Sequence, residues 1–152
     1  MYDSDRLCEE RALRTLLAEY ENKLDRTAVY IMNRLADCMF AQGKYAETET
    51  LVENNLLRAR EIGCLHPVQA DFLRTLAKTQ YELYKDDLAE QNIRNAIELY
   101  AENFAQELIR TCGTLERWLH GWCRDEEADE LRKRIDEIIR PDDIDMELNV
   151  YL

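Results

Sequence analysis

Residues 62–80 read IGCLHPVQADFLRTLAKTQ, a stretch that interrupts a regular polar-apolar pattern and then resumes it. Apolar residues recur every three or four positions on both sides of the interruption, as expected for amphipathic helices. Gly63 suits the left-handed conformation that commonly follows a helix, and Pro67 suits the first turn of the next one. The stretch therefore predicts a joint at which one helix ends and an antiparallel neighbour begins.

The same helical spacing extends through almost the whole chain, and no strand-like alternation interrupts it before residue 141. Gly, Pro or polar residues mark the ends of each periodic segment. The predicted helices span residues 5–23, 27–42, 44–62, 67–83, 86–101, 104–121 and 125–140. The sequence thus predicts an all-α fold with about seven helices.

An internal repeat underlies these helices. Leu35-Ala36, Leu76-Ala77 and Leu115-Glu116 are separated by 41 and then 39 residues. The same offsets relate three further series: Thr48, Ala89 and Ala128; Phe40, Tyr81 and His120; Asn55, Ala96 and Ile135. We interpret the chain as a domain over residues 1–140 built from two-helix units at about 27–65, 66–103 and 104–140, preceded by an orphan helix at 5–23. Such units stack because none buries its apolar face alone.

The segments LADCMFAQGKYAETETLVEN and LAKTQYELYKDDLAEQNIRNAIELY resemble the tetratricopeptide (TPR) repeat, and the His-Pro joint is similar to that of kinesin-light-chain-type long repeats. The resemblance implies a right-handed α-solenoid of antiparallel helix pairs, with HEAT-like pairs as the alternative. Four residues depart from the repeat pattern. They are Thr48 and Asn55 in unit one, and Glu116 and Arg132 in unit three.

The first helix of each pair lines the concave groove in this family, and the resemblance places one set of side chains there. They are Tyr30, Asn33, Asp37, Phe40, Arg74, Lys78, Tyr81, Arg110, Arg117 and His120. Arginine grips carboxylates with two hydrogen bonds and aromatic rings add apolar contact, so we expect an acidic or carboxylate-bearing peptide. The alternative is that these cations pair with nearby acids such as Asp37, Asp71 or Glu116.

Composition narrows the classes of partner. Twenty Lys and Arg against 32 Asp and Glu give a net charge of −12, which disfavours nucleic acid and anionic membranes as partners. No membrane span or secretory signal is readable. Five cysteines without a CxxC pair indicate reduced thiols and a cytoplasmic location. Cys112, His120 and Cys123 form only half of a zinc pattern, so we expect neither a metal nor a cofactor.

The function predicted from these patterns is non-enzymatic, because no nucleophile-base pair, metal set or phosphate loop is visible. We expect an adaptor that binds a protein or peptide in its groove. The alternative is a structural subunit, or a fragment of a larger assembly, that packs through its solenoid ends. Trp118 and Trp122 are expected to be part of the core. The tail at 141–152, with alternating apolar residues after Pro141, is expected to cap the last helix pair of its own chain or of a second copy in a homodimer.

Overall fold

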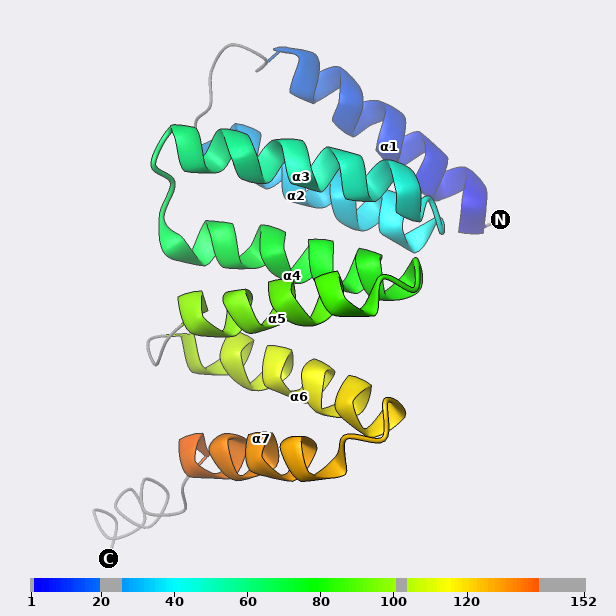
Figure 1. Ribbon diagram of the computed structural model, residues 1–152. Helices are drawn as coiled ribbons and strands as arrows, with labels where there is room; N and C mark the ends of the chain where they lie inside the picture. The colour runs from blue at the N-terminus through cyan, green and yellow to red at the C-terminus, as the bar shows by residue number, and fades with distance from the viewer. Residues whose placement is uncertain (1, 20–25, 101–103, 140–152) are drawn as a thin grey trace, which may run out of the picture. The chain divides into compact units, whose positions relative to one another are not determined.

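The computed structural model describes residues 2–19, 26–100 and 104–139, and these residues form α-helices and no β-strand (Figure 1). In chain order the helices are α1 (Tyr2–Glu19), α2 (Arg26–Ala41), α3 (Tyr45–Glu61), α4 (His66–Glu82), α5 (Asp86–Tyr100), α6 (Ala105–Gly121) and α7 (Asp125–Ile138). The chain divides into two compact units, residues 1–99 and 100–152, which we describe separately. No helix in the described residues is long and apolar enough to cross a membrane.

The predicted all-α fold is confirmed, and the helices α2 to α7 begin and end close to their predicted positions. Helix α1 begins at Tyr2, three residues before the predicted start at residue 5. Residues 20–23 of that predicted helix, and the tail at 141–152, lie outside the described residues. Between α3 and α4, Gly63 has a φ of 68° and Pro67 lies in the first turn of α4, as expected for the joint at residues 62–80.

Four of the loops end the preceding helix in the same way. The residue after the helix cap has a positive φ at Gly43, Gly63, Tyr84 and Cys123. In each loop its N–H donates to the carbonyl three residues earlier, and the next N–H donates to the carbonyl five residues earlier, as Gly43 and Lys44 do at 3.0 and 3.1 Å. This is the Schellman motif. Gly43, Tyr84 and Cys123 are separated by 41 and 39 residues, so the loops follow the same offsets as the sequence repeat.

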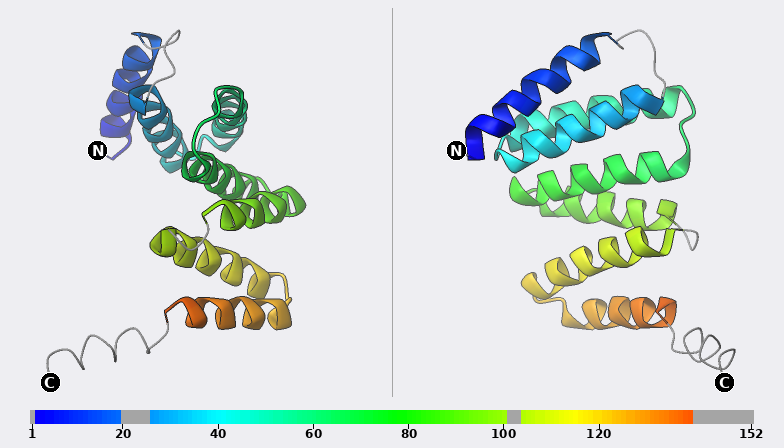
Figure 2. Two further views of the ribbon diagram at one scale, coloured as in Figure 1. Left: turned by 90° about the vertical axis from the view of Figure 1, so that its left-hand side faces the viewer. Right: turned by 180° about the vertical axis from the view of Figure 1, so that it is seen from behind.

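In the first unit, α2 lies between α1 and α4, and α3 packs along α4 (Figures 1 and 2). Helix α5 runs beside α4, and the side chain of Asn92 donates to that of Gln80 across them at 2.7 Å. The cores of these helices are apolar and closely packed: Leu35 and Val52 are almost fully buried, as are Leu73 and Ile93. Burial of this kind is the main source of stability for amphipathic helices.

In the second unit, α6 and α7 pack against each other as an antiparallel pair. Helix α6 buries Leu108, Cys112, Leu115, Trp118 and Leu119, whereas α7 buries only Ala128, Leu131 and Ile135. Trp118 is 7% exposed and Trp122 is half-buried, with their ring centres 6.1 Å apart. The expectation that Trp118 belongs to the core is confirmed, while Trp122 lies at its edge.

One polar residue in the core of the first unit allows a test of whether positions related by the repeat offsets have the same environment. Asn55 on α3 is buried, and its Nδ2 has no hydrogen-bond partner among the described residues. The equivalent positions hold Ala96 and Ile135, both buried. An unpaired buried donor costs about 1–3 kcal/mol. We therefore expect Asn55→Leu to raise the free energy of unfolding by about 1 kcal/mol in denaturant titrations.

Asn54→Leu is the matched control, because Asn54 is the exposed neighbour of Asn55. Its stability should stay within about 0.5 kcal/mol of the wild-type value, as is usual for surface substitutions. If Asn55→Leu is instead less stable than the wild type, the unpaired amide is not the dominant cost at this position.

Candidate functional site

The predicted groove residues of the first unit lie on two neighbouring helices, α2 and α4. Helical spacing of three or four residues places side chains on one face. We use the name α2–α4 surface for Arg34, Asp37 and Phe40 of α2 together with Asp71, Arg74 and Lys78 of α4. Four members of this set, Asp37, Phe40, Arg74 and Lys78, were predicted from the sequence.

An aromatic ring and a lysine connect the two helices at this surface. The Nζ atom of Lys78 lies over the ring of Phe40, 5.2 Å from its centre. The rings of Phe40 and Tyr45 also pack edge to face, with the ring centres 5.3 Å apart and the planes at 62°. A cation over an aromatic face at an exposed site contributes about 0.5–1 kcal/mol. Phe40 is therefore held in place from two sides, and the exposed Lys78 side chain carries its charge beside an apolar ring.

Carboxylates balance much of the positive charge on this surface. Arg74 Nη2 lies 3.6 Å from Asp71 Oδ1, and Arg34 Nη2 lies 2.6 Å from Glu9 Oε1 on α1. Asp37 is exposed, but the surrounding protein removes part of its hydration, and this desolvation raises the pKa of its carboxyl group. The positive charges of Lys78, Arg74 and Arg34 oppose that rise. The surface thus presents charges of both signs around the Phe40 ring, and the pairing of Arg74 with Asp71 agrees with the alternative in which these cations pair with nearby acids.

Three further predicted residues of the first unit lie on the same two helices. Tyr30 is 65% exposed on α2, seven residues before Asp37. Asn33 lies about one turn after Tyr30 and is half-buried. Tyr81 is half-buried on α4, three residues after Lys78. Tyr30 therefore offers an exposed aromatic side chain towards the beginning of α2.

Arg110, Arg117 and His120 lie on α6, in the second unit, and are described apart from the α2–α4 surface. Arg117 Nη2 lies 3.4 Å from Thr114 Oγ1 on its own helix. The Nδ1 atom of His120 lies 2.7 Å from Asp125 Oδ1, and this hydrogen bond raises the pKa of the imidazole. His120 therefore joins the end of α6 to the start of α7.

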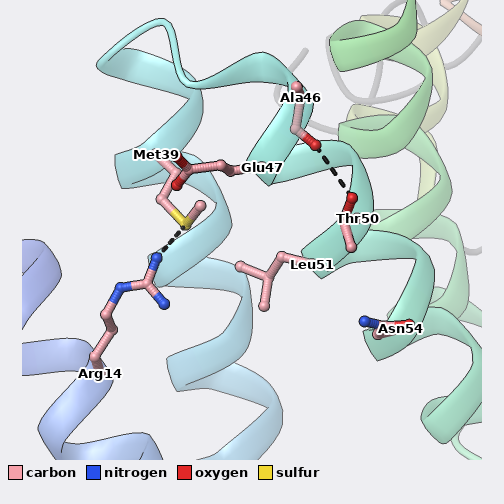
Figure 3. Close-up of a pocket in the computed structure, with 7 residues that line it drawn as sticks. All are labelled: Arg14, Met39, Ala46, Glu47, Thr50, Leu51 and Asn54. Carbon is pink, nitrogen blue, oxygen red and sulfur yellow. Dashed lines mark hydrogen bonds between the residues drawn. The ribbon is translucent and has the colours of Figure 1, made fainter.

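Sequence reasoning missed a groove between α1 and α3, with α2 at its floor (Figure 3). The groove has a volume of about 470 Å³ and is lined by Arg14, Met39, Ala46, Glu47, Thr50, Leu51 and Asn54. Arg14 Nη2 donates to Met39 Sδ at 3.5 Å across it. The α3 residues that line the groove share one face of that helix, because Ala46 and Thr50, like Glu47 and Leu51, are four residues apart. Such spacing alone does not distinguish a groove from an ordinary solvated face.

Potential metal ligands do not cluster in the described residues, which contain no group of three or more His, Cys, Asp or Glu positioned to hold a metal ion. Cys112 is buried in α6, whereas Cys123 is exposed in the following loop, so the half zinc pattern is not brought together. No known family model matches the chain, and no curated protein matches its sequence.

Proposed function

We propose that this chain is a non-enzymatic binding module of TPR-like helix pairs, arranged as a right-handed solenoid, that holds a segment of another protein on the α2–α4 surface. The repeat offsets of 41 and 39 residues, present in both the sequence and the Schellman loops, support the TPR-like part of the proposal. The five cysteines are all free thiols, which suits a cytoplasmic location.

The observation that carries the binding proposal is the exposed Lys78 ammonium over Phe40, with Asp37 and Arg74 close by. An incoming carboxylate would take the place of the protein's own acids around Lys78 and Arg74, and an apolar side chain would cover the ring of Phe40. Acids on the α2–α4 surface already balance its positive charges, so charge attraction alone would bind a partner weakly. Lys78 and Arg74 must therefore contact the partner together with the ring of Phe40. The partner is therefore expected to be a segment with both acidic and apolar side chains.

A displayed random peptide library tests the proposal on the intact chain. We expect the selected peptides to be enriched in Asp or Glu near apolar residues, and to bind more weakly as salt rises. The double substitution R74E/K78E should lower their affinity at least about tenfold, equal to about 1.4 kcal/mol. Titration calorimetry or fluorescence anisotropy measures that loss.

The matched control reverses a charge on another helix. Arg94 on α5 is exposed and pairs with Glu90 four residues earlier, so Arg94→Glu changes the net charge without touching the α2–α4 surface. Peptide affinity should remain close to the wild-type value in this variant. Equal binding by wild type and R74E/K78E would instead remove the α2–α4 surface from consideration.

A structural subunit of a larger assembly is the second candidate. Helix α1 supports it, because Leu7 and Leu16 are 40% and 44% exposed there. Apolar side chains of this size on an outer helix can serve contact with a further chain. The light-scattering mass separates the candidates, since a monomer at working concentration favours the adaptor and a stable dimer favours assembly.

A further inference from the structure

The shared offsets allow the three helix pairs to be compared position by position. The first helices are α2, α4 and α6, and the second helices are α3, α5 and α7. Their loops carry the positive-φ residue at Gly43, Tyr84 and Cys123. Leu35, Leu76 and Leu115 are buried at one equivalent position of the first helices. Thr48, Ala89 and Ala128, at one position of the second helices, are all fully buried.

The third pair differs from the others at three equivalent positions. The first position holds Ala36, Ala77 and Glu116; the second holds Val52, Ile93 and Arg132; the third holds Leu56, Ile97 and Asp136. In the first two pairs all these side chains are buried, with at most 5% of each residue exposed. In the third pair the Arg132 side chain is 51% exposed, and Asp136 is also exposed. The apolar positions of two pairs have thus become charged in the third.

Glu116 and Arg132 compensate each other within the third pair. Arg132 Nη2 lies 2.6 Å from Glu116 Oε2, and Arg132 Nε donates to Glu116 Oε1 at 3.2 Å. The guanidinium therefore grips both carboxylate oxygens, the geometry that strengthens such pairs. The Glu116 side chain is only 13% exposed, so Arg132 gives a largely buried carboxylate a charged partner. The two departures from the repeat pattern thus form one ion pair.

The first pair indicates what these positions normally do. Ala36 lies on α2, and Val52 and Leu56 lie on α3; both helices pack against α4, the first helix of the next pair. Val52 and Leu56 are four residues apart and therefore lie on one side of α3. The corresponding side of α7 holds Arg132 and Asp136, and every exposed residue from 129 to 137 is charged. The buried residues of α3 have equivalent positions in the third pair. Of the side chains at those positions, only that of Ile139 is both apolar and exposed, at 49%.

We infer that the face of the α6–α7 pair that carries Glu116, Arg132 and Asp136 is a stop for helix stacking, so that a further helix pair, including one from a second copy of this chain, does not pack there. Covering the face would remove water from an ion pair and a second carboxylate, and desolvation of such groups costs more than their attraction returns unless new partners are supplied. Assembly by end-to-end stacking through α7 is thereby disfavoured.

Restoring the residues of the other pairs tests the inference. In E116A/R132I/D136I, the face carries the apolar pattern of the α4–α5 pair. We expect this variant of the full chain to self-associate, with a light-scattering mass that rises with concentration towards twice the wild-type mass. The control E116Q/R132Q/D136N is equally uncharged but polar, and its mass should follow the wild type. Peptide binding on the α2–α4 surface is a separate readout, so either proposal can fail alone.

Two outcomes would overturn the inference. One is a helical apolar variant whose mass equals that of the wild type at every concentration. The other is self-association of the polar control to the same extent, because loss of the ion pair and not an apolar face would then be the cause. If the triple variant is not helical by circular dichroism, E116A/R132I is measured in the same way, and its mass must exceed that of the wild type.

Discussion

Trp118→Ala is expected to lower the free energy of unfolding by about 3–5 kcal/mol, the range for truncation of a large buried aromatic side chain. Trp118 is 7% exposed in α6, where Leu115 and Leu119 on the same helix are almost fully buried. Removing the indole leaves a cavity that the surrounding side chains refill only in part. For a chain of this length, the melting temperature should fall by roughly 10 °C.

Trp122→Ala is the matched control, because Trp122 is the same residue type at the half-buried cap of α6. Its substitution removes less buried surface, so the loss of stability should be clearly smaller. Thermal unfolding followed by circular dichroism measures both variants. Equal losses for the two would show that Trp118 does not anchor the core of the second unit more than Trp122 does.

Glu10→Gln is expected to have the next largest effect, a loss of about 2–3 kcal/mol, because it removes a buried charge from a hydrogen-bonded network. Glu10 on α1 is 6% exposed. Its Oε1 accepts from Arg14, and its Oε2 accepts from Gln42 at 3.0 Å and from Lys44 at 2.7 Å. Gln42 and Lys44 lie in the loop between α2 and α3. The network therefore holds α1 against the α2–α3 pair.

The contribution of Glu10 should depend on pH. The hydrogen bond from Lys44 is the main cause that lowers its pKa from 4.5 to about 2, while burial opposes the change. A group whose pKa is lower in the folded state stabilises the fold above its unfolded pKa, and this stabilisation is lost as pH falls towards the folded pKa. The stability difference between wild type and Glu10→Gln should thus be full near neutral pH and shrink between about pH 4.5 and 2.

The control for Glu10 is its neighbour. Glu9 pairs with Arg34 at 2.6 Å, but both side chains are well exposed, at 40% and 52%. Such surface pairs contribute about 0–1 kcal/mol. Glu9→Gln should therefore change the melting temperature little. Hydrogen exchange along α1 provides a second measurement, because Glu10→Gln should accelerate exchange there before it affects α4. A pH-independent difference, or equal effects of Glu9→Gln and Glu10→Gln, would contradict the assigned role.

Helix positions and loops could be predicted because their causes are local. The 3.6-residue period of apolar side chains, with Gly63 and Pro67 at a joint, depends only on residues near one another in the chain. The repeat offsets also marked equivalent positions, because they are found by comparing the sequence with itself and need no knowledge of packing. The predicted gaps between the helices at 67–83 and 86–101, and between those at 104–121 and 125–140, were also correct. Tyr84 and Cys123 supply the left-handed residue in these two loops without being glycine.

The side-chain partners could not be predicted, because they lie on different helices. The period of α1 does not reveal that Glu10, an acid in a charged helix, is buried against Lys44, 34 residues away. Glu116 and Arg132 each looked like a departure from the repeat until packing of α6 on α7 brought them within 2.6 Å. Lys78 was expected in a basic groove, but its contact with Phe40 and the acids near it depend on how α4 packs on α2. Local periodicity sets where helices form, whereas burial and charge pairing depend on which helix faces meet.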